Sequence, residues 1–297
     1  MATKPKLLIV LGPTASGKTG LAIKLCQKYS GEIISADSRQ IYQEMDIGTA
    51  KPNKEELAAA KHHLVDFIKP SYNFTLAEFI KLANNNIEKL HKEDKLPIMA
   101  GGTGLYISAI ADNYDLPKGK IDLGLRKRLE NKSNTELFEM LAELDPQSAT
   151  TIDPNNARRL IRALEYVIIN QKSFIASQSV KQSPYDILQL GIKIDKDILL
   201  KRINKRVDLM IEQGLVAVVK DLIAKYDKNL PSLRTVGYQE IIDHLEGKTT
   251  LEEAIELIKI HTRQYAKRQM TWFKRDKNIK WIKSYTEANK LVKKWLK

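Results

Sequence analysis

The chain has 297 residues, with 49 Lys or Arg and 36 Asp or Glu, so its formal net charge is +13. This surplus favours a polyanionic partner such as nucleic acid, and a basic surface without a partner is the alternative. One cysteine, Cys26, excludes an internal disulfide, and its place in an apolar pattern favours buried packing. Neither a signal-peptide core nor a run of transmembrane length is visible, so we expect a cytoplasmic protein without a membrane partner.

The first motif is GPTASGKT, between an apolar run at 6–11 and a helical pattern at 20–29. A strand, a glycine-rich loop ending in Gly-Lys-Thr and a helix form the Walker A or P-loop arrangement. Its backbone N–H groups converge on phosphate oxygens, the lysine adds positive charge, and the threonine hydroxyl can ligate Mg²⁺. We therefore predict a site for a phosphate compound. Its residues are Gly12, Pro13, Thr14, Ala15, Ser16, Gly17, Lys18 and Thr19.

Two further strands are predicted at 32–35 and 96–100. The first ends just before Asp37, and the second runs into a glycine-rich turn with Thr103. Ligands of open α/β sheets bind at this carboxyl edge of the strands. The second strand lacks the terminal acid of a Walker B motif, which weakens an ATPase interpretation and favours a special role for Asp37. A helix-capping role is the alternative for this residue. His62 and His63 lack metal-ligand spacing, so a surface or packing role is expected.

Thr75 is a candidate N-cap for an amphipathic helix that extends to about residue 94. From residue 118 the pattern changes to helices at 123–132, 134–144 and 155–170, and strand character returns at 187–194. We therefore predict an α/β fold, a P-loop NTPase-like parallel sheet flanked by helices, with a mostly helical insertion domain. The catalytic core would comprise 1–117 and 187–297, and the insertion domain 118–186.

The last third of the chain is predicted to be helical at 195–226, with a break near Gly214, and again at 251–274. A loop at 232–240 separates these segments. The final helix interleaves basic residues with Tyr265, Trp272 and Phe273. This composition suits stacking on single-stranded nucleic acid, while an aromatic stripe packed in the core is an equally weighted alternative.

Six stretches together resemble the bacterial tRNA dimethylallyltransferases: GPTASGKT, SADSRQIYQEMDIGTAKP, AGGTGLY, NARRLIRALE, RTVGYQE and RQYAKRQMTWF. They occur in family order over nearly the whole chain, and ADSRQIY followed by DIGTAKP is the most specific. The resemblance implies transfer of a dimethylallyl group from dimethylallyl diphosphate to N6 of the adenine 3′-adjacent to the tRNA anticodon, with release of diphosphate. The P-loop would hold the diphosphate instead of a nucleotide.

The resemblance also assigns roles to residues. Asp37 would be the general base, Thr103 and Arg206 would lie near the reacting groups, and Thr19 would ligate the Mg²⁺ cofactor. The anticodon stem-loop would be bound by Asp37, Ser38, Arg39, Gln40, Thr103, Arg126, Arg158, Arg159, Leu160, Ile161, Arg162, Arg234, Gly237, Tyr238 and Gln239. A solvated helix face is the alternative for the arginines at 158–162. We expect a monomer.

Three other functions stay open from the sequence. A small-molecule P-loop kinase shares the first strand, loop and helix, but the missing Walker B acid argues against it. An RNA-binding protein without catalysis is disfavoured because Lys18, Thr19 and Asp37 are all present. A prenyltransferase acting on free adenosine phosphates is the nearest rival. The helical insertion and the basic final helix favour a macromolecular substrate over that rival.

Overall fold

The computed structural model describes residues 4–116, 122–177, 179–180 and 182–297. The chain divides into two compact units, Met1–Ala111 with Ser183–Lys297, and Asp112–Gln182. The predicted first boundary, between 117 and 118, lies outside the described residues, but residues 112–116, which the prediction assigned to the core, group with the second unit. At the second boundary the prediction assigned residues 183–186 to the insertion, whereas they group with the first unit. The reason is local pairing, since Asp186 is already in register with Lys6 of the sheet.

The first unit is built on a six-stranded parallel sheet in the order β3-β2-β4-β1-β7-β8. Its four longer strands were predicted from apolar runs, which are typical of strands buried on both faces. The two edge strands, β3 and β8, were missed because two or three residues carry no readable periodicity. The strands are β1 (Lys6–Leu11), β2 (Gly31–Ala36), β3 (His62–His63), β4 (Leu96–Gly101), β7 (Asp186–Ile192) and β8 (Lys280–Ile282).

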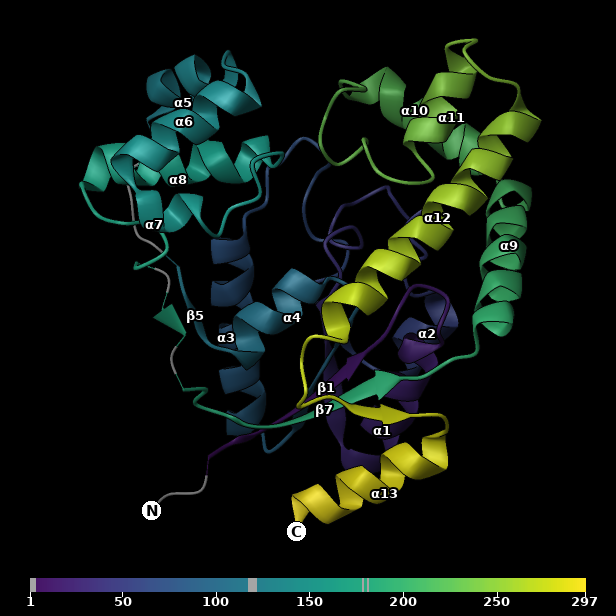
Figure 1. The fold of residues 1–297 in the computed structure, drawn as a ribbon. Helices are drawn as coiled ribbons and strands as arrows, with labels where there is room; N and C mark the ends of the chain where they lie inside the picture. Colours follow the sequence, from purple (N-terminus) through teal and green to yellow (C-terminus); the bar gives the residue numbers. More distant parts are fainter. Residues whose placement is uncertain (1–3, 117–121, 178, 181) are drawn as a thin grey trace. The chain divides into compact units, whose positions relative to one another are not determined.

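Helices cover both faces of this sheet (Figure 1). Helices α1 (Lys18–Tyr29) and α13 (Tyr285–Leu296) pack on the face that carries Leu8 and Val10. Helices α3 (Leu76–Lys92) and α4 (Gly104–Ala111) pack on the face that carries Leu7 and Ile9. Successive residues of a strand point to opposite faces, so the run at 6–11 supplies both cores. Cys26 lies on the buried face of α1, as predicted.

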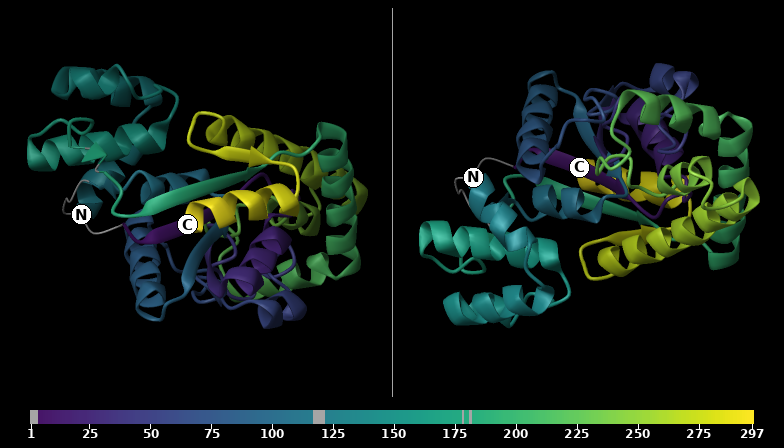
Figure 2. Two further views of the ribbon diagram at one scale, coloured as in Figure 1. Left: turned by 90° about the horizontal axis from the view of Figure 1, so that it is seen from below. Right: turned by 90° about the horizontal axis from the view of Figure 1, so that it is seen from above.

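A helical layer in the same unit extends beyond the carboxyl edge of the sheet. It comprises α9 (Lys196–Glu212), α10 (Leu215–Lys225), α11 (Gln239–Leu245) and α12 (Leu251–Phe273), with the short α2 (Lys54–Ala59) nearby. Figures 1 and 2 show the long helix α12 running beside α9, and both pack on the loop that contains Ile41 and Met45. The predicted break is confirmed at Gly214, whose φ of 94° glycine adopts without strain.

The second unit has its own hydrophobic core, formed by α5 (Leu123–Glu130), α6 (Asn134–Leu144), α7 (Pro146–Ala149) and α8 (Ala157–Asn170). Side chains of Asp122, Ser133 and Asn156 cap three of these helices, and the predicted helical segments are confirmed. A small antiparallel pair, β5 (Tyr114–Asp115) and β6 (Ser179–Val180), was not predicted. Within the described parts of both units, no helix is long and apolar enough to cross a membrane.

Candidate active site

The P-loop connects β1 to α1 at the carboxyl edge of the sheet. Ala15 and Gly17 have φ angles of 60° and 90°, so the backbone curls before Lys18 begins the helix. A left-handed conformation at Gly17 suits glycine, because it has no Cβ. A Cβ at Gly12 would lie 2.8 Å from Ser16 Oγ, so this position also needs glycine. The predicted strand, loop and helix of the P-loop are confirmed.

Two cationic side chains meet at the P-loop. Lys18 Nζ lies 3.4 Å from the Pro13 carbonyl oxygen, and Arg206 of α9 donates to Thr14 Oγ1 at 3.5 Å. Burial lowers the pKa of Lys18 to about 8; the Asp37 carboxylate opposes this shift, and Arg206 adds to it. Burial also lowers the pKa of Arg206. The carboxylate of Asp37 acts on both cations, and that of Glu56 acts on Arg206. Two desolvated cations at one site favour binding of a polyanion.

Asp37 follows β2 directly, at the same edge. Its carboxylate accepts a hydrogen bond from the backbone N–H of Arg39 at 2.9 Å, which fixes the turn after the strand. Thr103, which follows β4, accepts a hydrogen bond from the backbone N–H of Ser38 at 2.9 Å. Since β2 and β4 are neighbours, the two polar turns that the sequence singled out lie side by side. Thr103 therefore positions the segment that carries Asp37.

Lys18, Asp37 and Arg206 line a cavity of about 370 Å³ in the first unit, whereas Thr103 is not among its lining residues. Its polar lining includes Thr14, Lys18, Asp37, Ser38, Arg39, Arg206 and Arg234. Its apolar lining comes from Val207, Met210, Val236 and Ile258. A lining that combines cationic and apolar side chains suits a ligand that joins a phosphorylated group to a hydrocarbon chain.

Helix α12 supplies residues to this cavity that the prediction did not assign. Tyr265 lines it, and burial raises the pKa of its hydroxyl to about 12, with the Asp37 carboxylate adding to the effect. Gln269 is buried and hydrogen-bonds the P-loop and the turn after β4. The sequence pattern RQYAKRQMTWF predicted a helix, but its spacing did not indicate which face of that helix packs against the protein. Phe273 packs in the core, whereas Trp272 is partly exposed and donates to Ser108 Oγ.

Two predicted tRNA contacts need correction. Leu160 and Tyr238 are both fully buried, Leu160 in the core of the helical unit and Tyr238 against Gly48. Their side chains contribute to packing and do not present an RNA-facing surface. Gln239 donates to Asp243, and Gln40 donates to the carbonyl oxygens of Thr49 and Ala50.

The remaining predicted RNA contacts lie on both units. Ser38, Arg39, Arg234 and Gly237 line the cavity of the first unit. In the second unit Arg158 and Arg159 are exposed near the start of α8, and Ile161 is half-buried. Arg126 forms a two-pronged hydrogen bond to the buried carboxylate of Glu165, at 2.7 and 2.6 Å, and Arg162 lies 3.8 Å from the same carboxylate. These last two arginines therefore have a structural partner.

The donor set near the P-loop fits Mg²⁺. Thr19 and Asp37 line one small cavity, and they offer a hydroxyl and a carboxylate oxygen. Mg²⁺ is commonly held by one or two such protein oxygens, with phosphate oxygens and waters completing its shell. Among the described residues there is no cluster of three or more His, Cys, Asp or Glu side chains that would form an all-protein metal cage. A metal bound here would therefore be shared with a phosphorylated ligand.

The parallel sheet, the P-loop and the adjoining cavity define the class: an α/β protein with a P-loop phosphate site at the carboxyl edge of its sheet. A profile of the IPP transferase family matches residues 40–276, and the chain belongs to this family.

Individual relatives align with nearly the full length of this chain. The tRNA dimethylallyltransferase of Alkaliphilus oremlandii is 46% identical and covers 99% of this chain and 97% of the relative. That of Acetivibrio thermocellus is 45% identical, over 97% and 95%. The crystal structure of the tRNA isopentenylpyrophosphate transferase from Bacillus halodurans matches with a TM-score of 0.77 and 38% identity, over 99% and 97%. A eukaryotic dimethylallyltransferase solved acting on tRNA matches with a TM-score of 0.81 and 30% identity, over 90% of this chain and 69% of that chain.

Proposed function

We infer that this protein is a tRNA dimethylallyltransferase. It transfers a dimethylallyl group from dimethylallyl diphosphate to N6 of the adenine 3′-adjacent to the tRNA anticodon, and diphosphate is released. The observation that carries this inference is the cavity that Lys18, Arg206 and Asp37 line together with apolar side chains, in a chain whose relatives are named tRNA dimethylallyltransferases. The P-loop binds the diphosphate, and the apolar side chains accommodate the prenyl chain.

The chemistry requires a proton acceptor and a stabilised leaving group. The N6 lone pair attacks the first carbon of the dimethylallyl group, and the bond from that carbon to the diphosphate oxygen breaks. Asp37 accepts the proton that N6 loses. Lys18 and Arg206 neutralise the charge that develops on the diphosphate, with P-loop N–H groups as further donors. Thr103 holds the turn at Ser38, so that the carboxylate of Asp37 stays at the adenine.

Mg²⁺ is proposed as the cofactor. Thr19 would hold it from the protein side, and it would add further positive charge at the leaving diphosphate, beside Lys18 and Arg206. The fit rests on the hydroxyl of Thr19 at one small cavity, while the carboxylate of Asp37, which lines the same cavity, serves as the proton acceptor. Lys18, Arg206 and the P-loop bind and orient the diphosphate.

The anticodon stem-loop is proposed to contact both units. The target adenine must leave its stack to reach the carboxylate of Asp37 in the cavity, as in other enzymes that act on a base. Arg39 and Arg234 line the cavity and are suited to phosphates next to the flipped nucleotide. Arg158 and Arg159 present charge at the surface of the helical unit, where they would bind the RNA backbone. The monomeric state and the cytoplasmic location stay predictions.

A direct assay tests the function. The protein is incubated with dimethylallyl diphosphate, Mg²⁺ and unmodified tRNA, and the digested nucleosides are analysed by mass spectrometry. We expect an adenosine heavier by one dimethylallyl group. Parallel reactions replace tRNA with AMP, ADP or ATP. Faster modification of a free nucleotide than of tRNA would overturn the assignment, and tRNA-independent ATP hydrolysis would indicate a kinase-like enzyme.

A further inference from the structure

A second, much smaller cavity lies beside the P-loop. Its volume is about 20 Å³, which is enough for one water molecule. Thr19 and Asp37 line it together with two residues of neighbouring strands, Ser35 of β2 and His62 of β3. The mechanism proposed above uses the first two residues and leaves Ser35 and His62 without a role.

Both of these side chains have a buried polar atom without a partner. Ser35 is 4% exposed, and neither its Oγ nor His62 Nε2 has a hydrogen-bond partner within the described part of the chain. A buried polar atom left unsatisfied costs about 1–3 kcal/mol. Two such atoms at one water-sized cavity indicate that they bind something there.

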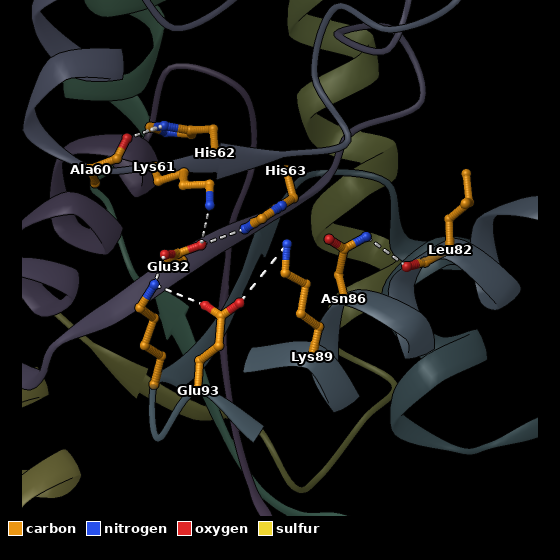
Figure 3. Close-up of polar contacts among 10 residues, drawn as sticks. Glu32, Ala60, Lys61, His62, His63, Leu82, Asn86, Lys89 and Glu93 are labelled. Carbon is orange, nitrogen blue, oxygen red and sulfur yellow. Dashed lines mark hydrogen bonds and ion pairs between the residues drawn. The ribbon is translucent and has the colours of Figure 1, made fainter. Parts of the chain in front are cut away.

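The hydrogen-bonding role of His62 follows from its other ring nitrogen. Nδ1 lies 2.7 Å from the carbonyl oxygen of Ala60, as Figure 3 shows. A carbonyl oxygen can only accept, so Nδ1 carries the hydrogen. Burial also lowers the pKa of His62, which favours the neutral ring. Nε2 is therefore a buried hydrogen-bond acceptor on a side chain that lines the cavity.

We propose that Ser35 and His62 bind a water molecule in the hydration shell of the Mg²⁺ held by Thr19. This proposal rests on the proposed function, because that function places Mg²⁺ at the P-loop. Mg²⁺ gives up its waters reluctantly and usually keeps several of them. A metal-bound water is a strong donor and needs acceptors, and His62 Nε2 and Ser35 Oγ are acceptors at the right cavity. His62 acts from outside the first coordination shell, since Mg²⁺ prefers oxygen to imidazole ligands.

The neighbouring histidine provides a matched control. His63 follows His62 in the same short strand, but its Nε2 lies 2.6 Å from Glu32 Oε2 (Figure 3). Lys61 and Lys95 contact the same carboxylate. His63 is thus satisfied by a side-chain network that does not line the small cavity. Its replacement should disturb local packing without changing the metal site.

The test measures metal binding and not only turnover. Calorimetry gives the Mg²⁺ affinity of the full chain in the presence of saturating diphosphate, for the wild type and for Ser35→Ala, His62→Gln and His63→Gln. Diphosphate affinity without metal and the melting temperature are measured for each. Loss of such outer-shell partners typically weakens metal binding about 10- to 100-fold. We expect about tenfold for Ser35→Ala and for His62→Gln, with metal-free diphosphate binding unchanged and with no effect of His63→Gln on the metal.

The outcomes distinguish failure of this proposal from failure of the function on which it rests. If the wild type binds diphosphate and Mg²⁺ but the folded Ser35 and His62 variants keep wild-type metal affinity, the hydration-shell role is wrong and the function stands. If the wild type binds no Mg²⁺ with diphosphate, the proposed cofactor and the hydration-shell role are both wrong, and the nucleoside assay decides the function separately. Paramagnetic resonance of Mn²⁺ in the same complex, with ¹⁵N-labelled histidine, distinguishes the coordination. A weak coupling to His62 supports the water-mediated role, and a strong direct coupling overturns it.

Discussion

Gln269 of α12 accepts a hydrogen bond from the backbone N–H of Thr14, with 2.8 Å between N and Oε1. Its Nε2 donates to the carbonyl oxygen of Gly102 at 2.9 Å. One side-chain amide thus connects the P-loop with the turn after β4, although 255 residues separate it from Thr14. A Cβ at Gly102 would lie 2.3 Å from this Nε2, so the close approach requires glycine there.

Replacing Gln269 with Leu should leave the Thr14 amide and the Gly102 carbonyl unsatisfied. Each lost partner in a buried site costs about 1–3 kcal/mol, so the free energy of unfolding should fall by about 2–6 kcal/mol. Because the P-loop loses its anchor, kcat should fall about tenfold or more while the KM for tRNA changes little. Urea denaturation and steady-state kinetics check both effects. Unchanged kcat in a destabilised variant would show that the amide is structural only.

Asp37→Asn should remove the proton acceptor while preserving the shape of the side chain. A positioned general base contributes about a hundred- to ten-thousandfold, so single-turnover prenyl transfer should slow by that order. The N–H of Arg39 can still be bonded by the amide oxygen, so the turn and the tRNA affinity should change much less. Near-normal turnover, or a loss of tRNA binding in proportion to activity, would assign Asp37 to positioning instead.

Diphosphate affinity should depend on pH through Lys18. With a pKa of about 8, its ammonium group is charged below that pH and neutral above it. Affinity should therefore fall as the pH rises from about 7 to about 9, because the anion binds the charged form. Lys18→Arg keeps its charge over this range, so its titration serves as the control. Equal pH dependence of the two proteins would exclude Lys18 as the titrating group.

The same lowered pKa has a consequence for stability. The folded pKa of Lys18 lies below its ordinary value of 10.5, so between these values the unfolded chain binds more protons. The free energy of unfolding of the unliganded protein should therefore rise with pH between about 8 and 10.5. Below about pH 8 the destabilisation caused by the buried, charged ammonium group is fully present. The difference between wild type and Lys18→Met in denaturant melts isolates this contribution.

The exposed arginines of α8 should govern the salt dependence of tRNA binding. Each phosphate contact contributes about 0.7–0.9 to the slope of log affinity against log salt. Arg158→Gln with Arg159→Gln should therefore reduce the slope by about one to two. Arg162 is kept in this variant because it lies near buried Glu165. Diphosphate affinity should stay at the wild-type value, and an unchanged slope would mean that α8 does not contact RNA.

Arg126→Ala should act through stability more than through RNA contact. It leaves Glu165, 1% exposed, without its two-pronged partner. Breaking a buried ion pair costs about 3 kcal/mol. The double variant Arg126→Met with Glu165→Met removes both charges and should recover most of that loss, as circular dichroism melts would show. If the double variant folds normally but still loses tRNA affinity, Arg126 also binds RNA directly.

The sequence by itself determined those elements that depend only on residues close together in the chain. The run at 6–11, the loop from Gly12 to Thr19 and the cap at Thr75 are set by alternation, by glycine conformation and by contacts three residues apart. It also placed Asp37 at the end of a strand, and parallel strands share their carboxyl edge.

Only the tertiary structure decided which distant residues meet and which side chains are inside. The anchoring of Thr14 by Gln269, the approach of Arg206 to the P-loop and the burial of Leu160 and Tyr238 depend on how α8, α9, α11 and α12 pack. Ser35 and His62 line one cavity because of the register of β2 and β3. Packing selects one inward face and one strand register from several that the local pattern allows, because it must fill the core and satisfy buried polar groups at once.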